Sequence, residues 1–231
     1  MILGLDPIYW LFMLPGLIIG LVAQFKLKST YARYIQEPTD SGLSGAQAAR
    51  EILNRAGLHD MPVEEVPGQL TDHYDPIRKK LCLSAENYRG RSIAALGVAA
   101  HEAGHALQHK AAYGPLQLRM AMVPITSFAS SASMILIMIG LFVASAMGQK
   151  MMLVGVGLFG LVTLFQLVTL PVEFDASRRA KEQLLNLGLI THHEHTGVSR
   201  VLNAAAMTYV AAMVTAVLQL LYFLSLANRR E

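Results

Sequence analysis

Two histidines four residues apart, with a glutamate directly after the first, are the side chains of this sequence best suited to chemistry. His101 and His105 lie about one helical turn apart, so both imidazoles can face the same metal ion. Glu102 lies about 100° around that helix from His101, within reach of a water on the metal. This H-E-x-x-H spacing predicts a zinc ion held by the two histidines, with Glu102 as the general base.

The residues before the motif favour a metal site over two unrelated histidines on a solvated helix. Residues 93–100 are mostly apolar and predict a buried helix that leads into the motif. Ionisable side chains are rare in such surroundings unless they are paired or bound to a metal. The apolar lead-in therefore supports the zinc hypothesis.

The composition is that of a membrane protein. Hydrophobic residues make up 53% of the chain and charged residues only 15%. The net charge of +3 is small, and no dense run of Lys and Arg with interleaved aromatic residues occurs, so we expect no nucleic-acid partner. The one cysteine, Cys82, excludes an intramolecular disulfide and a zinc site built from several cysteines.

Four apolar runs are long enough to cross a bilayer. We expect these spans at residues 8–25, 121–147, 151–172 and 201–227. Lys26, Lys28 and Arg33 follow the first span, so the positive-inside rule places this side in the cytoplasm and the amino terminus outside. Residues 148–150 would join the second and third spans as a tight hairpin.

The fold class that follows is a mainly α membrane protein with a small cytoplasmic α+β region. We treat residues 1–231 as one membrane domain, with its polar parts at 26–118 and 173–200. Residues 44–56 predict an amphipathic helix ended by Gly57. Three short strands of an antiparallel sheet are predicted at residues 63–66, 70–74 and 79–84. An edge strand could hold an extended substrate peptide, or the sheet could merely cap the helix of the motif.

A catalytic zinc ion needs at least a third protein ligand, commonly a carboxylate, and keeps one position open for water. The two spans from residue 121 to 172 return the chain to the side of the membrane that carries the motif. There, Pro171 is placed to begin a helix. Glu173 on this helix is our prediction for the third ligand.

Two neighbouring side chains are not expected to bind the same ion. Asp175 lies about 200° around the helix from Glu173, so it should pair with Arg178 or Arg179 instead. His109 continues the series of histidines, but it lies about 12 Å along the helix axis from the first of them. That separation is too large for zinc bonds of about 2 Å.

Three segments together carry a family resemblance. They are L-T-D-H-Y-D-P at residues 70–76, G-V-A-A-H-E-A-G-H-A at 97–106 and P-V-E-F-D-A-S at 171–177. The chain resembles the bacterial YugP-like neutral zinc metallopeptidases over nearly its whole length, and it is more distantly similar to the HtpX-like and CAAX-prenyl membrane proteases. The resemblance implies His101, His105 and Glu173 as zinc ligands and Glu102 as the general base.

One position departs from the more distant families. Their motif E-[FY]-x-A-D ends in an aspartate where this chain has Ser177. That aspartate would support a ligand histidine through a hydrogen bond. Asp72, Asp75 or a backbone carbonyl could provide this support, and the sequence does not choose between them.

These residues predict a zinc metalloendopeptidase with one Zn2+ ion per chain. It would hydrolyse peptide bonds of membrane or membrane-proximal proteins at the cytoplasmic face of the cell membrane, in contact with the lipid bilayer. Glu102 would take the proton of the attacking water and pass it to the leaving amine. His73, Tyr74 and Tyr209 are candidate donors to the tetrahedral oxyanion.

A non-enzymatic membrane scaffold or assembly factor with a structural zinc site is the main alternative. Structural zinc sites usually fill all four positions, often with cysteine, and this chain has one cysteine. A small-ion transporter would need ionisable residues inside its spans, whereas residues 121–172 contain only Lys150, at the hairpin. The sequence leaves the substrate and the oligomeric state open.

Overall fold

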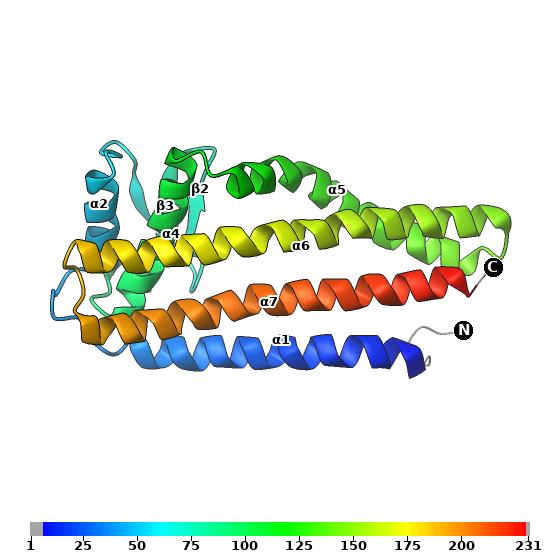
Figure 1. The fold of residues 1–231 in the computed structure, drawn as a ribbon, viewed down its shortest axis with the longest axis horizontal. Helices are drawn as coiled ribbons and strands as arrows, with labels where there is room; N and C mark the ends of the chain where they lie inside the picture. Colours follow the sequence, from blue (N-terminus) through cyan, green and yellow to red (C-terminus); the bar gives the residue numbers. More distant parts are fainter. Residues whose placement is uncertain (1–6, 230–231) are drawn as a thin grey trace. The chain divides into compact units, whose positions relative to one another are not determined.

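The computed structural model describes residues 7–229 of the chain. Most of these residues are helical, and three short strands among them form a small sheet (Figure 1). The elements follow the chain in the order α1 (Pro7–Tyr34), α2 (Gly45–Arg55), β1 (Val63–Val66), β2 (His73–Asp75), β3 (Lys80–Ser84), α3 (Ala85–Arg89), α4 (Ile93–Lys110), α5 (Gly114–Phe142), α6 (Ala146–Asn186) and α7 (His192–Asn228).

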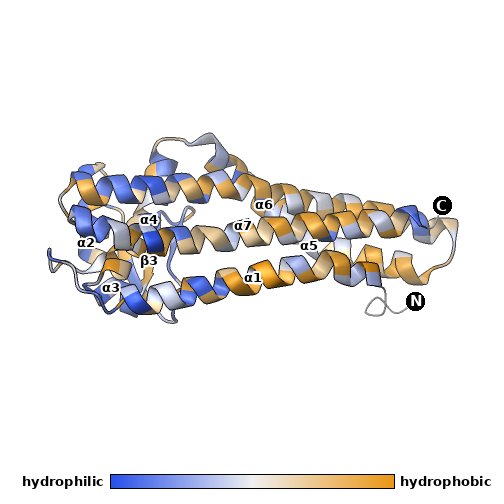
Figure 2. Cartoon of the chain, turned by 60° about the horizontal axis from the view of Figure 1, so that its bottom comes forward, coloured by the Kyte–Doolittle hydropathy of each residue, from blue (hydrophilic) through white to orange (hydrophobic). Residues whose placement is uncertain are grey.

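The chain folds into two compact units. The helical unit contains residues 7–23, 117–170 and 208–229 of the described chain, and the α/β unit contains residues 24–116 and 171–207. Helices α1, α5, α6 and α7 each contribute residues to both units. Figure 2 shows the change of character along α1, which is hydrophobic over most of its length and hydrophilic at one end. The α/β unit thus contains most of the polar part of the sequence.

Among the described residues, four helices are long and apolar enough to cross a membrane: α1, α5, α6 and α7. Large apolar side chains are exposed on the helical unit, and Leu11, Phe128 and Phe142 are 69%, 71% and 77% exposed. Such a surface is unfavourable in water but suits contact with lipid tails. The prediction of a mainly α membrane protein with four transmembrane helices is confirmed.

The connection between the second and third membrane helices lies earlier than predicted. α5 ends at Phe142, and α6 already includes residues 148–150, so these residues do not form the hairpin turn. Ser145 caps α6, because its Oγ accepts a hydrogen bond from the backbone N–H of Gly148 at 3.3 Å. A Cβ at Gly148 would overlap the carbonyl oxygen of Val143. Gly148 therefore permits the first turn of α6 to pack closely against Val143. The sequence pattern indicates a turn at residues 148–150 instead.

Helix α6 runs without interruption from Ala146 to Asn186, through Pro171. The prediction that Pro171 begins a new helix is therefore wrong. An interior proline removes one backbone hydrogen bond and crowds the preceding turn. Packing of the next turn outweighs this cost, since Val172 and Ala176 are both 0% exposed. As a result, Glu173 lies well inside a long helix and not in its first turn.

The sheet has the strand order β1-β3-β2 and is mixed. β2 pairs antiparallel with β3, with Tyr74 opposite Leu81, whereas β1 pairs parallel with β3, with Val63 opposite the same leucine. The prediction of an antiparallel sheet is therefore wrong for β1. The Asp75 carboxylate accepts two backbone N–H groups of the turn after β2, which closes the hairpin with β3 and leaves the other edge of β3 for β1. The strand predicted at 70–74 is observed as the three residues of β2.

Helix α4 lies in the core of the α/β unit and is buried on most sides. Small side chains permit this burial, as Ala99, Ala100 and Ala103 are all 0% exposed. Gly104 permits a very close approach to α6, because a Cβ there would lie 2.6 Å from the carbonyl oxygen of Ala176. The contact between α4 and α6 therefore depends on a residue without a side chain inside the H-E-x-x-H motif.

We expect Gly104→Ala to destabilise the protein, because the added methyl group would push α4 away from the backbone of α6. Overpacking of this kind costs about 1–3 kcal/mol. The midpoint of thermal unfolding of the detergent-purified protein should fall by several degrees. Gly160→Ala is the matched control, since a Cβ at Gly160 would meet nothing within 4 Å. Equal midpoints for the two variants would contradict the close helix contact.

Candidate metal centre

The two histidines of the motif lie on α4. Ser92 caps the start of this helix, since its Oγ accepts a hydrogen bond from the backbone N–H of Ala95 at 3.2 Å. The ring centroids of His101 and His105 lie 4.8 Å apart, with their planes at 80° to each other. Their side chains are only 13% and 10% exposed. The four-residue spacing therefore brings both imidazoles to one largely buried place.

Glu173 on α6 completes a cluster of three side chains of the metal-ligand type. Its Oε2 lies 3.2 Å from His101 Nε2 and 3.7 Å from His105 Nε2. One ligand atom of each residue lies within 4.8 Å of those of the other two. Residues from two helices, about seventy positions apart in the sequence, thus converge on one point.

The cluster has suitable dimensions for zinc. Zinc in proteins is usually tetrahedral, with bonds of about 2.0–2.2 Å to histidine nitrogen and carboxylate oxygen, so neighbouring ligand atoms lie about 3.3 Å apart. The separations of the Glu173 oxygen from the two histidine nitrogens are close to this value. Two nitrogens and one oxygen would also leave the fourth position of the tetrahedron open. The residues present therefore fit a zinc ion with room for water or substrate.

The charges around the cluster favour a cation. Glu173 is only 1% exposed, and a buried carboxylate is unfavourable unless a cation or several donors lie beside it. Burial by itself lowers the pKa of His105, but the hydrogen bond to Glu173 and the negative charges of Glu102 and Glu173 outweigh it and raise the pKa. Negative groups that stabilise a proton on His105 would equally stabilise a metal ion in its place.

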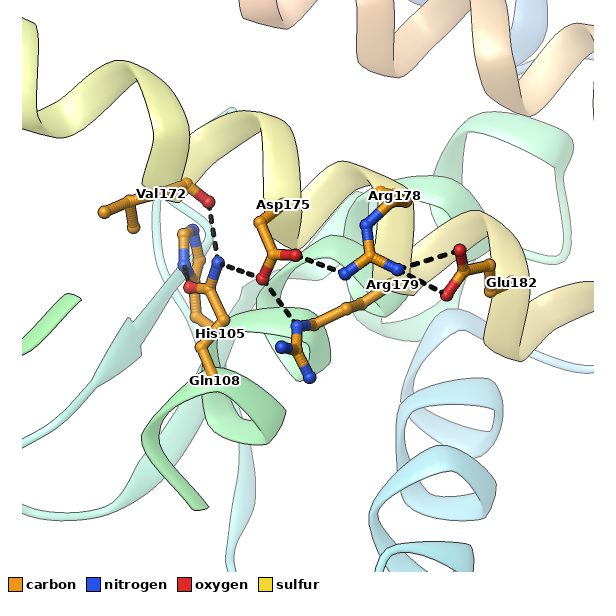
Figure 3. A network of polar contacts seen from close by, with 7 residues as sticks. All are labelled: His105, Gln108, Val172, Asp175, Arg178, Arg179 and Glu182. Carbon is orange, nitrogen blue, oxygen red and sulfur yellow. Dashed lines mark hydrogen bonds and ion pairs between the residues drawn. The ribbon is translucent and has the colours of Figure 1, made fainter. Parts of the chain in front are cut away.

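Gln108 holds the ring of His105 in one orientation (Figure 3). Its Nε2 donates hydrogen bonds to the carbonyl oxygen of Val172 at 2.8 Å and to Asp175 Oδ2 at 3.0 Å. Its Oε1 lies 3.0 Å from His105 Nδ1 and accepts a hydrogen bond from it, because an amide oxygen cannot donate. The imidazole proton is therefore on Nδ1, and Nε2 presents its lone pair to the cluster.

Ser177 makes the corresponding contact with His101. Its Oγ lies 3.1 Å from His101 Nδ1, where it can accept the Nδ1 proton and leave Nε2 for a metal. Of the alternatives left open by the sequence, Asp72 accepts hydrogen bonds from Ser84, and Asp75 accepts backbone N–H groups of its own turn. The serine at the position of the expected aspartate therefore supports the histidine itself.

Gln108 was not among the predicted site residues. It follows His105 by three positions, which places it on the same face of α4, and this spacing is the signal that could have indicated it. Its burial is visible only in the fold, where it is 0% exposed. Asp175 links the glutamine to a surface network, because it also pairs with Arg178 and with Arg179 (Figure 3). The predicted pairing of Asp175 with these arginines is confirmed.

Glu102 follows His101 on α4 and is 8% exposed. Its charge contributes to the raised pKa of His105. Within the described residues it makes no hydrogen bond or ion pair of its own, so its carboxylate remains able to accept a proton from water.

Two of the three candidate oxyanion donors, His73 and Tyr74, are neighbours on β2 of the α/β unit. The Nδ1 of exposed His73 lies 2.8 Å from the carbonyl oxygen of Thr71. The hydroxyl of Tyr74 lies 2.8 Å from His109 Nδ1, and burial together with the charge of Asp75 raises the pKa of Tyr74 to about 12. The phenol of Tyr74 thus keeps its proton at neutral pH. Tyr209 belongs to the part of α7 in the helical unit.

Comparison with known proteins identifies the family. The sequence model described as "Putative neutral zinc metallopeptidase" matches residues 9–228. The chain belongs to this family. A curated relative, "Putative membrane protease YugP" of Bacillus subtilis (strain 168), is 48% identical over 203 residues, which cover 87% of this chain and 88% of the relative. No solved structure gives a significant match.

Family and fold agree on a membrane protein of the zinc metallopeptidase class, and the resemblance to the YugP-like family is confirmed. The family implies zinc. In the described part of the chain, the cluster of His101, His105 and Glu173 is a group that could hold this ion.

We expect Gln108→Ala to weaken zinc binding without removing a ligand, because the ring of His105 loses the acceptor that fixes its orientation. Loss of such a supporting hydrogen bond typically costs about 10–100-fold in metal affinity. The zinc affinity would be measured by competition for zinc between the protein and a chromophoric chelator. Gln36→Ala, a change at an exposed glutamine after α1, is the control. Wild-type affinity in Gln108→Ala would refute the supporting role.

Proposed function

We propose that this protein is a zinc metalloendopeptidase of the H-E-x-x-H type, acting on peptide bonds of membrane or membrane-proximal proteins. The observation that carries the proposal is the convergence of His101 Nε2, His105 Nε2 and Glu173 Oε2. Three ligands of this kind are typical of catalytic zinc sites, whereas structural sites are usually closed by a fourth ligand. We therefore favour an enzyme over a scaffold with structural zinc.

His101, His105 and Glu173 would hold one zinc ion, with Ser177 and Gln108 fixing the two rings. When bound, zinc supplies Lewis acidity, which polarises a scissile carbonyl and lowers the pKa of water to near 7. Glu102 acts as the proton carrier: it takes a proton from the attacking water and gives it to the leaving amine.

We propose that the substrate lies in extended form along β2. This strand is at the edge of the sheet, and its Tyr74 bonds to His109, one turn beyond His105 on α4. Main-chain hydrogen bonds to the edge of β2 that no described strand pairs with would hold a peptide beside α4, with little dependence on the peptide's side chains. The neutral phenol of Tyr74 is then the candidate best placed along that strand to donate to the oxyanion.

We expect Glu102→Gln to lose peptidase activity by about 10²–10⁴-fold while keeping its zinc, because the glutamine cannot carry a proton. Glu173→Gln should lose both activity and zinc. The assay uses detergent-purified full-length protein, a quenched fluorogenic peptide library and metal analysis, with one zinc expected per wild-type chain. Glu51→Gln, at an exposed position on α2, is the control.

Two outcomes would contradict the enzyme. Full hydrolysis by zinc-loaded Glu102→Gln would exclude Glu102 as the base. A wild-type protein that hydrolyses no peptide, keeps one zinc ion and unfolds when the ion is removed would favour the scaffold with a structural zinc site.

The proposed orientation places the amino terminus outside and the active site in the cytoplasm. We expect a membrane-impermeant maleimide to label Gln36→Cys in inverted vesicles and Met147→Cys in right-side-out vesicles. Both positions are exposed, and Met147 is 64% exposed at the start of α6. The native Cys82 is buried and serves as the unlabelled background. The reverse pattern would overturn the orientation.

A further inference from the structure

A cavity of about 730 Å³ lies between helices of the α/β unit, lined by residues of α1, α6 and α7. Its lining includes Lys26 and Arg33 from α1, Phe174 from α6, and Arg200 and Met207 from α7. Small-molecule sites commonly have volumes of about 300–1,000 Å³. The cavity is therefore large enough for a ligand.

The lining carries positive charge and no carboxylate. Lys26, Arg33 and Arg200 contribute three cations, and the remaining residues are neutral. Arg33 pairs with Glu37 through its Nε at 2.9 Å, which leaves its terminal nitrogens for a further acceptor. Lys26 makes no ion pair within the described residues. The cavity thus has the electrostatics of an anion site.

One of these cations is held in place by a buried side chain. Arg200 Nη1 donates a hydrogen bond to the hydroxyl of Tyr34 at 3.0 Å, and Tyr34 is only 5% exposed. This bond joins α1 and α7 across more than 160 positions of sequence. The fold therefore brings the three cations to one cavity. Membrane proteins carry a general excess of Lys and Arg on their cytoplasmic side, but that excess alone would not gather these side chains in one place.

The cavity is also lined by apolar side chains. Phe174 and Met207 are 50% and 43% exposed, and Ala204 and Ala206 lie beside them. In sequence, Lys26 directly follows the apolar run of α1, and Arg200 directly precedes that of α7. Cations at this point of two membrane-crossing helices are suited to the headgroup level of a bilayer. The lining fits a ligand with an anionic end and an apolar end.

We propose that this cavity binds an anionic phospholipid, with the headgroup phosphate on Lys26, Arg33 and Arg200 and the first part of an acyl chain against Phe174 and Met207. Arginine pairs with phosphate through two N–H groups, and lysine acts as a point charge. A free phosphate ion would share the polar contacts but leave Phe174 and Met207 without a partner. The inference rests on the membrane fold and not on peptidase activity.

The test measures binding of dioctanoyl phosphatidylglycerol, below its micelle concentration, to the full-length protein in detergent. Saturable binding is expected, with affinity falling about fivefold for each of Lys26→Gln and Arg200→Gln, as for the loss of one lipid-facing charge. Lys28→Gln is the matched control, because Lys28 is exposed on the same helix and does not line the cavity. Dioctanoyl phosphatidylcholine and inorganic phosphate are the comparison ligands.

Each comparison has a decisive outcome. Equal binding of phosphatidylcholine would overturn the anionic site, and equal binding of inorganic phosphate would overturn the lipid. Equal losses of lipid affinity in Lys28→Gln and Lys26→Gln would show that the lipid responds to surface charge and not to the cavity. Ser29→Phe, which would block the cavity and keep all three cations, should abolish lipid binding, and thermal unfolding checks that each variant is folded. Retained binding in Ser29→Phe would also refute the site.

Discussion

Glu173 carries a buried carboxylate that the residues around it must stabilise. With 1% of its surface exposed, it is stable as an anion only beside positive charge or several donors. His101 and His105 lie next to it, and they can do so because Gly104 lets α4 approach the backbone of α6 near Ala176. The geometry of the site therefore depends on the packing of α4 against α6. A change that separates α4 from α6 affects both.

Hydrogen bonds at the Nδ1 atoms of the two histidines orient their rings so that they can act as metal ligands. Gln108 and Ser177 lie at the Nδ1 atoms and leave both Nε2 atoms toward Glu173. Gln108 is itself held by Val172 and Asp175 of α6. The orientation of a ring on α4 thus depends on backbone and side-chain atoms of another helix. Loss of such a supporting contact typically costs about 10–100-fold in metal affinity.

Long helices connect the polar chemistry with the membrane. α6 carries an apolar stretch and, further along, Glu173 and Ser177, without a break at Pro171. α1 and α7 likewise pass from apolar residues to the cations of the proposed lipid cavity. Lys26 and Arg200 lie in sequence at the ends of the apolar runs of α1 and α7.

The four apolar spans, the helix of the motif and the shared face of His101 and His105 could be predicted from the sequence, because these features depend on hydrophobic length and on spacing within one helix. The sequence also indicated Glu173, through the even number of spans that separates it from the motif. The sequence pattern did not predict that β1 runs parallel to β3, that α6 continues through Pro171, or that Gln108 and Ser177 support the two rings. Those features depend on which segments pack against each other in space, where burial and hydrogen-bond satisfaction outweigh local pattern.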